Sequence, residues 1–267
     1  MSPILTTILG ISFIFLCTTL GSAVVFFFPK KEISNKVSQI FTGFAAGIML
    51  AASFFSLILP SLETEVTYMP IWLVVGISIL LGALFLYGID KIVPHFHVKE
   101  NEEEGIQTRR LSKTSKMFLA VTIHNVPEGL SVGIAFGVAL ASLANGSPMG
   151  VMTSAFMLAL GIGLQNIPEG AVVSLPVRSE TGNKKKAFLF GMFSGAVEPI
   201  AAVAGLFLAL SIQVIMPWAL SFAAGCMIYV VAEEMIPDLK DNNSSHYGVF
   251  SFIFGFILMM ILDIALG

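Results

Sequence analysis

Long apolar stretches dominate the pattern of hydrophobic and polar positions, and each is long enough to cross a lipid bilayer. Eight of them approach the length of about 20 helical residues that a hydrocarbon core requires. The apolar residues run continuously, unlike the alternating ten-residue strands of an outer-membrane barrel. The pattern predicts an all-α integral membrane protein with one eight-helix membrane domain over 1–267, its spans near 4–28, 39–59, 71–89, 117–140, 151–175, 187–211, 218–237 and 247–266.

Composition supports lipid as the main solvent of this chain. Of 267 residues, 56% are hydrophobic and 12% are charged, whereas soluble domains have about a quarter charged. Residues 1–29 contain no Lys or Arg, so the first stretch lacks the positive start of a signal peptide and is predicted to remain as a span. The net charge of −3 is too small to inform on nucleic acid, but no basic arm or aromatic-basic stripe is present, so no nucleic-acid partner is predicted. Cys17 and Cys226 lie in apolar stretches and are interpreted as buried free thiols.

Basic residues give the chain an orientation. All 14 Lys and Arg fall in the connections after the first, third, fifth and seventh spans. Cytoplasmic loops of membrane proteins carry this excess, so both termini are predicted to be extracytoplasmic. The longest connection, 90–116, is charged and is predicted to be a flexible cytoplasmic loop.

Two short motifs occur twice. His-Asn-Val-Pro-Glu-Gly at 124–129 resembles Gln-Asn-Ile-Pro-Glu-Gly at 165–170, and Phe-Ala-Ala-Gly-Ile-Met at 44–49 resembles Phe-Ala-Ala-Gly-Cys-Met at 222–227. In the predicted topology the fourth and fifth spans run in opposite directions, and so do the second and seventh. Repeats of opposite direction are typical of transporters whose site lies at the repeat interface.

Several acidic residues lie inside the predicted spans without a basic partner. Glu128, Glu169, Glu198 and Asp263 are accompanied by His124, and no Lys or Arg lies deep in any span. Each ionisable residue costs roughly 2.5–3.5 kcal/mol at the centre of a membrane helix. Such a group indicates either protonated carboxyls or a bound cation.

The spacing of the first motif favours a cation. His124 and Glu128 are one helical turn apart, and Asn125 lies within the same arc; Gln165, Asn166 and Glu169 repeat the arrangement. The proline in each motif frees a carbonyl of the preceding turn. Imidazole nitrogen with carboxylate and amide oxygen suits zinc, Fe(II), Mn or Co better than Cu(I), Mg or Ca. The alternative is structural: the histidine or the amides only join neighbouring helices.

Other candidates carry weaker signals. Glu198 is either a ligand or a proton acceptor, and Met49 either a ligand or core, whereas Met227 fits core better. Residues that suit either an ion entrance or exit, or a solvated end, are Glu233, Glu234, Asp238 and Asp263. His95 and His97 form one H-x-H in the long cytoplasmic loop, and His246 is interpreted as interfacial.

The chain resembles the ZIP (Zrt/Irt-like) metal transporters, in particular their bacterial GufA-like branch. The resemblance runs over all eight spans and rests on residues 124–129 and 165–170, Gly-Ala-Val-Glu-Pro at 195–199, the Ala-Ala-Gly-x-Met of the second span and Glu-Glu-Met-Ile-Pro at 233–237. It implies helices grouped as three, two and three, and a two-metal centre. By position, one metal would bind Met49, His124, Glu128, Gln165 and Glu169, and the other Asn125, Glu128, Asn166, Glu169 and Glu198.

Two departures from the family pattern affect these expectations. Several relatives have aspartate where this chain has Asn166, so the second site is expected to be weaker or auxiliary. Relatives often have histidine where this chain has Glu233, which makes this end of the seventh span more acidic here.

The predicted function is influx of divalent transition metals, zinc foremost and also Fe, Mn, Co or Cd, across a bacterial plasma membrane. The metal is a substrate, and no cofactor is predicted. The alternative is a proton-coupled carrier of an organic solute. An enzyme is disfavoured because H-E-x-x-H is absent and nothing resembles a Ser/His pair. No Walker-type motif is present either. The sequence leaves the oligomeric state open, a homodimer included.

Overall fold

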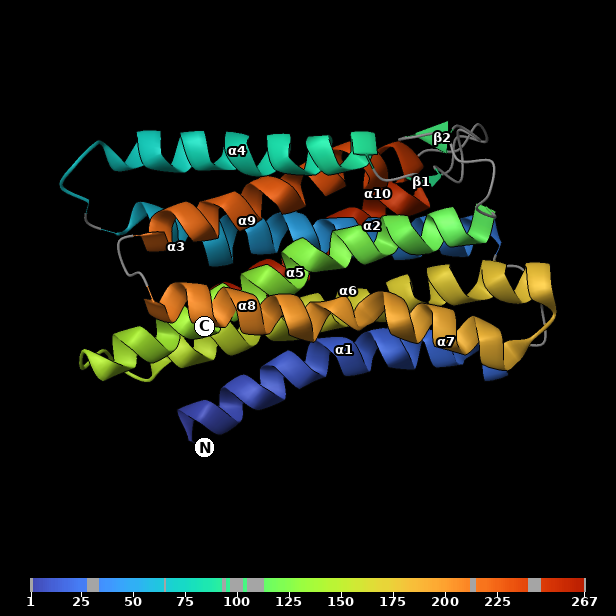
Figure 1. Cartoon of the computed structure of the whole chain (residues 1–267), viewed down its shortest axis with the longest axis horizontal. Helices are drawn as coiled ribbons and strands as arrows, with labels where there is room; N and C mark the ends of the chain where they lie inside the picture. Colours follow the sequence, from blue (N-terminus) through green and yellow to red (C-terminus); the bar gives the residue numbers. More distant parts are fainter. Residues whose placement is uncertain are drawn as a thin grey trace.

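The predicted helical membrane architecture is confirmed. The computed structural model describes residues 2–27, 34–64, 66–92, 95–96, 103–104, 113–211, 215–239 and 246–266. Within these residues, eight helices are long and apolar enough to cross a membrane, and they lie along the long axis of the molecule (Figure 1). The first five spans are α1 (Pro3–Phe27), α2 (Asn35–Ala52) with η1 (Ser53–Ile58) and α3 (Leu59–Leu62), α4 (Ile71–Ile92), α5 (Lys113–Ala144) and α6 (Gly150–Thr181).

The last three spans are each built from two helical segments. They comprise α7 (Lys184–Gly195) with α8 (Val197–Ser211), α9 (Met216–Val230) with the π-helix η3 (Val231–Met235), and α10 (Tyr247–Ile261) with the π-helix η5 (Leu262–Leu266). A short 3-10 helix, η4 (Pro237–Leu239), follows η3. The sixth span, predicted near 187–211, is a candidate membrane span over Lys184–Leu210 whose helix is interrupted at the single residue Ala196. Pro199 has no N–H for the carbonyl of Gly195, which accounts for the break.

The long cytoplasmic connection differs in part from its prediction. Asp90 was assigned to the loop 90–116, but it lies in the last turns of α4 and is 4% exposed. Within the loop, β1 (His95–Phe96) pairs antiparallel with β2 (Glu103–Glu104). His97 lies outside the described residues.

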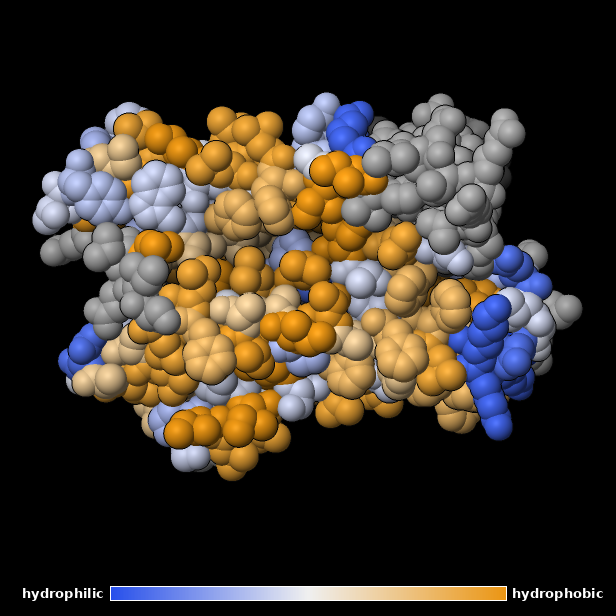
Figure 2. All heavy atoms as spheres, viewed as in Figure 1, coloured by the Kyte–Doolittle hydropathy of each residue, from blue (hydrophilic) through white to orange (hydrophobic). Residues whose placement is uncertain are grey.

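The surface has the character expected of a protein surrounded by lipid. Large apolar side chains are exposed along the outer helices, among them Leu20, Phe207 and Phe250. Apolar residues cover the middle of the face in Figure 2, and hydrophilic ones gather toward its ends. Both termini lie toward the same end of the bundle (Figure 1), as an even number of spans requires. The chain is therefore a multi-pass membrane protein.

Helices α5 and α6 lie at the centre of the packing. They contact each other, and each also packs on an outer helix: α5 on α8, and α6 on α1. The remaining spans form two further pairs, α2 with α10 and α4 with α9. Two further contacts, of α6 with α2 and of α5 with α9, link the central helices to these outer pairs. The duplicated Pro-Glu-Gly motifs thus lie on the two enclosed helices.

Glycines set the closest helix contacts. A Cβ placed on Gly47 would lie 2.0 Å from the carbonyl oxygen of Phe252 in α10, and one placed on Gly225 would lie 2.2 Å from that of Ile79 in α4. Small residues let the backbones of membrane helices approach in this way. The two glycines belong to the duplicated Phe-Ala-Ala-Gly motif, so both copies of the motif perform the same packing task.

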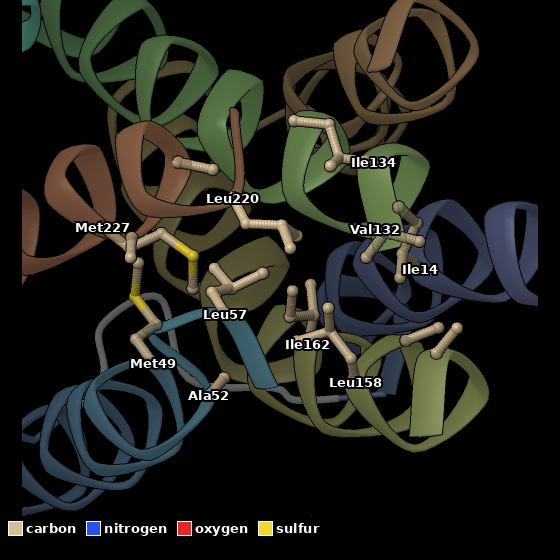
Figure 3. Close-up of a cluster of buried hydrophobic side chains, with 14 of the residues drawn as sticks. Ile14, Met49, Ala52, Leu57, Val132, Ile134, Leu158, Ile162, Leu220 and Met227 are labelled. Atoms are coloured by element: carbon tan, nitrogen blue, oxygen red, sulfur yellow. The ribbon is translucent and has the colours of Figure 1, made fainter. Parts of the chain in front are cut away.

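The same two spans also change helical form at corresponding places. The π-helix η1 begins at Ser53, four residues after Met49, and η3 begins at Val231, four residues after Met227. π-helical turns are rare and are often found at functional sites. Met49 and Met227 themselves are almost fully buried in the hydrophobic cluster and lie next to each other in Figure 3.

Candidate metal centre

Five polar side chains from the predicted site are fully buried in the middle of the bundle. Their exposed fractions are zero, although each carries a charge or an amide. They come from α5, α6 and the first turn of α8: Asn125, Glu128, Gln165, Asn166 and Glu198. Glu169, on α6, is only partly buried. Burying polar groups in this number is costly unless partners compensate them, which indicates a dedicated site.

Hydrogen bonds fix the orientation of three of these side chains. Gln165 Nε2 donates to Glu128 Oε1 at 2.7 Å, joining α6 to α5. Asn125 Nδ2 donates to the carbonyl oxygen of Ser194 at 2.9 Å, in the last turn of α7 before the break. Because the nitrogen of each amide is occupied in this way, its oxygen remains to serve as an acceptor or a ligand.

The oxygens left over form the most informative feature of the site. Within the described part of the chain, one oxygen of each buried side chain has no hydrogen-bond partner: Asn125 Oδ1, Glu128 Oε2, Gln165 Oε1, Asn166 Oδ1 and Glu198 Oε2. The Nδ2 donor of Asn166 has none either. Buried polar atoms in folded proteins nearly always have a partner, so five such acceptors in one region need an explanation. A cation is a partner that only acceptors can bind.

Three carboxylates act on one another in this region. The charges of Glu169 and Glu198 both bear on Glu128, and Glu169 also bears on Glu198. Like charges held together without water repel strongly. A divalent cation among them would reverse the sign of this interaction, because each carboxylate would then face a larger positive charge.

His124 points to a neighbouring acidic group. Its Nε2 is paired with Glu234 Oε1 of η3, and the charges of Asp90 and Glu169 also bear on the imidazole. His124 therefore links the buried carboxylates to Glu234 and Asp90. The sequence analysis did not select Asp90, because it placed this residue in a loop. Only a third apolar stretch that continued past residue 89 would have indicated a helical, buried Asp90.

The remaining candidates do not belong to this set of five fully buried polar side chains. Met49 lies in the hydrophobic cluster beside Met227 (Figure 3). Glu233 is exposed, Asp238 is partly buried and His246 is exposed. Asp263 Oδ1 accepts a hydrogen bond of 2.6 Å from Ser56 Oγ, which joins η5 to η1.

Carboxylates and imidazole alone do not form the centre. Across the described ranges, no three His, Cys, Asp or Glu side chains lie close enough together to hold one ion. The amide oxygens of Asn125, Gln165 and Asn166 lie among the carboxylates instead. An amide oxygen with carboxylate oxygens and one imidazole is a donor set for a divalent ion of intermediate hardness.

Two contacts of the site escaped sequence analysis. Thr18 Oγ1 of α1 donates to Glu198 Oε1 at 2.6 Å, and Ser194 offers its backbone carbonyl to Asn125. Neither residue has a sequence signal, since a threonine in an apolar helix usually bonds its own backbone and a backbone carbonyl is present in every residue.

In the described part of the chain, eight candidate spans surround a buried group of carboxylates and amides, an arrangement that defines a multi-pass membrane protein with a polar centre. A sequence model described as "ZIP Zinc transporter" matches residues 4–115 and 114–263. The chain belongs to this family, whose members are transporters and not enzymes. The resemblance inferred from the motifs is thereby confirmed.

Individual relatives match along almost the whole chain. Zinc transporter ZIP11 of Homo sapiens is 31% identical, covering 100% of this chain and 98% of the relative. Zinc transporter ZIPB of Bordetella bronchiseptica is 34% identical over 95% of this chain and 79% of the relative. Zinc transporter GufA of Myxococcus xanthus is 33% identical over 89% of this chain and 90% of the relative. The bacterial relatives agree with the predicted bacterial inner membrane.

Proposed function

We propose that this protein carries zinc into the cytoplasm through the buried centre between α2, α5, α6 and the α7–α8 span. The observation that carries the proposal is the set of five buried oxygens that lack hydrogen-bond partners in the described structure, placed among three mutually repelling carboxylates. Zinc is foremost because relatives covering most of the chain are zinc transporters. Fe, Mn, Co and Cd are further substrates that this donor set suits.

We propose two overlapping ion positions bridged by Glu128 and Glu169. The first draws on those glutamates with Met49, His124 and Gln165, and the second draws on them with Asn125, Asn166 and Glu198. Because no three His, Cys, Asp or Glu side chains of the described residues lie close enough together to hold one ion, metal binding must draw these ligands together. The hydrogen bond between Gln165 and Glu128 supports the first set, because both ligands already lie within contact of each other. Asn166 contributes no charge, so the second position binds more weakly.

Release toward the cytoplasm follows the acidic residues beyond His124. The imidazole is paired with Glu234 and is influenced by Asp90, so it lies between the centre and these carboxylates. An ion bound by His124 can pass to Glu234 by exchange of one ligand at a time. At the opposite end, Asp263 with Ser56 is a candidate for first capture. Ion gradient and membrane potential supply the driving force.

An inverted-repeat relation between the two halves of the chain fits capture of the ion at one end of the bundle and release at the other. The contacts of α1 with α6 and of α2 with α10 correspond to those of α8 with α5 and of α9 with α4. The matched glycines Gly47 and Gly225 and the matched π-helices η1 and η3 support the same relation. If the two repeats exchanged their conformations, the centre would open first to one side of the membrane and then to the other.

The proposed orientation predicts which loops thiol reagents reach from outside. Cysteine at Asn145, between α5 and α6, is expected to react with a membrane-impermeant maleimide on intact cells, whereas cysteine at Lys185, at the start of α7, is not. Cys17 and Cys226 are buried and should contribute little background. Permeabilised cells provide the control, in which both positions should react. If only Lys185→Cys were labelled on intact cells, the orientation would be the opposite of the proposed one.

Zinc binding itself is tested by thermal unfolding of the purified protein in detergent. Zinc at a hundredfold excess over its Kd should raise the unfolding temperature by about 5–10 °C, because a ligand at that excess stabilises the folded state by about 2.7 kcal/mol. The Glu128→Gln variant should lose most of this shift. Calcium at the same concentration is the matched control and should shift the wild type much less.

The same measurement separates the alternative carrier from the proposed one. A proton-coupled carrier of an organic solute has no reason to respond to zinc, so its unfolding temperature would be the same with and without the metal. An equal shift in wild type and Glu128→Gln would place zinc at some other site and would contradict the proposed centre.

A further inference from the structure

We propose that Thr18 is a positioning residue for the Glu198 carboxylate, an inference that rests on the proposed function. Its hydroxyl holds one carboxylate oxygen and so presents the other oxygen to the ion. Thr18 lies on α1, outside the spans that supply the metal ligands. The proposal concerns the affinity of the centre and assigns no ligand role to Thr18.

The contact has the geometry of a strong hydrogen bond. Thr18 Oγ1 lies 2.6 Å from Glu198 Oε1, and both residues have an exposed fraction of zero. The same hydroxyl also lies 3.3 Å from the carbonyl oxygen of Ile14, its own helical neighbour. A hydroxyl has a single proton, and the charged acceptor at the shorter distance takes it. Thr18 thus donates to the carboxylate in preference to its own backbone.

The hydrogen bond gives the two oxygens of the Glu198 carboxylate different roles. Glu198 Oε1 is occupied by Thr18, whereas Oε2 is the oxygen that has no hydrogen-bond partner within the described structure. The charges of Glu169 and Glu128 bear on the same carboxylate. Without the hydroxyl, Oε1 would lose its partner, and the side chain could move away from the neighbouring carboxylates that repel it.

Two glycines hold Thr18 at this place. A Cβ placed on Gly195 would lie 2.6 Å from Thr18 Cγ2, and one placed on Gly170 would lie 2.1 Å from the Thr18 carbonyl oxygen. Both contacts are too short for any side chain at these glycines. Residue 18 is therefore enclosed between α6 and α7, and its rotamer is determined by packing. A positioning group needs this kind of rigid support.

The repeat explains why a hydroxyl lies opposite this carboxylate. Gly170 packs on the carbonyl of Thr18, and Gly129, its counterpart in the other motif, packs on the carbonyl of Glu198. Thr18 and Glu198 thus occupy corresponding positions relative to the two Pro-Glu-Gly motifs. One half of the protein supplies the carboxylate and the other half supplies its hydrogen-bond donor, where a second carboxylate would only add repulsion.

Zinc uptake into proteoliposomes tests the proposal with Thr18→Val and Thr18→Ser. Thr18→Val should raise the KM for zinc about tenfold or more, because removing the partner of a ligand typically weakens metal affinity 10- to 100-fold. Thr18→Ser keeps the hydroxyl and should remain within about threefold of the wild type. Thr18→Ala removes the hydroxyl without crowding the site and is the second variant should Thr18→Val not fold.

The matched control is Thr19→Val on the same helix. Thr19 Oγ1 donates to the carbonyl oxygen of Phe15 in its own helix at 2.9 Å and has no other partner among the described residues, so this variant should leave the KM unchanged. The decisive comparison repeats Thr18→Val in a Glu198→Gln background, where its effect should fall below about twofold if the hydroxyl acts through the carboxylate.

The outcomes separate this proposal from the proposed function. A wild type that takes up no zinc overturns both. A wild type that transports zinc while Thr18→Val and Thr18→Ala behave like Thr19→Val overturns the role of Thr18 alone. An undiminished effect of Thr18→Val in the Glu198→Gln background also overturns it, because the residue would then act on folding or on another group.

Discussion

Replacing Glu128 or Glu169 with alanine is expected to remove about nine-tenths or more of zinc uptake into proteoliposomes. Both carboxylates are shared by the two proposed ion positions, so neither position survives the loss of one. Losing only the partner of a ligand already weakens metal sites 10- to 100-fold, and loss of a bridging ligand should exceed that. Glutamine variants at the same positions remove the charge while preserving the volume, and they should fail to the same degree.

The control for this experiment lies on the same helix as Glu169. Glu180 is exposed near the end of α6, and Glu180→Ala should transport zinc as the wild type does. Size-exclusion profiles in detergent would verify that every variant is folded. Wild-type rates in folded Glu128→Ala and Glu169→Ala would show that the ion takes another route, and the organic-solute carrier would become the better hypothesis.

Gly129→Ala is expected to lower both stability and uptake, although it adds a single methyl group. The new Cβ would lie 2.2 Å from the carbonyl oxygen of Glu198 and 2.8 Å from its Cα. Since both neighbours are backbone atoms, α8 must move away from α5. Overpacking of this kind costs about 1–3 kcal/mol, which lowers the unfolding temperature of a protein of this size by roughly 2–10 °C.

The loss of uptake in Gly129→Ala should be larger than its loss of stability suggests. Moving α8 carries Glu198 away from Glu128 and Glu169, so zinc uptake is expected to fall to about a tenth of the wild-type rate. Thermal unfolding in detergent and uptake into proteoliposomes measure the two effects on one preparation. Wild-type values in both would contradict the close approach of α5 and α8.

Gly76→Ala provides the matched control for a glycine in a helix. Gly76 lies on α4 with nothing within 4 Å of a Cβ placed on it, so alanine meets no neighbour. Alanine is favoured over glycine in helices by about 1 kcal/mol, so this variant should unfold at the wild-type temperature or slightly above it. The comparison separates the steric effect at Gly129 from the loss of glycine as such.

Much of the architecture could be predicted from sequence because lipid imposes simple rules. A membrane helix satisfies its backbone internally, so an apolar stretch of sufficient length is almost bound to be a helix. The predicted spans agree with the observed ones to within a few residues at most ends. Glu128 and Glu169 lie on α5 and α6, which contact each other, and the metal site that they were predicted to share stays a prediction.

The errors arose where packing overrides composition. Asp90 was predicted to lie in a loop because a charged residue usually ends an apolar span, yet it is buried in α4 near His124. The interruption at Ala196 is local instead, because Pro199 has no N–H for the carbonyl of Gly195. At Asp90 the local sequence favours a loop, whereas packing against residues distant in the chain keeps it in a buried helix.

The sequence by itself determined the class of protein, the number of spans, the family and the main candidate ligands, because hydropathy and residue spacing are local properties. Only the tertiary structure decided how these residues are used. It joined Gln165 to Glu128, turned His124 to Glu234, placed Met49 beside Met227 and brought the hydroxyl of Thr18 to Glu198. Contacts between residues as much as 180 positions apart depend on how whole helices pack, and glycines such as Gly129 and Gly170 set that distance.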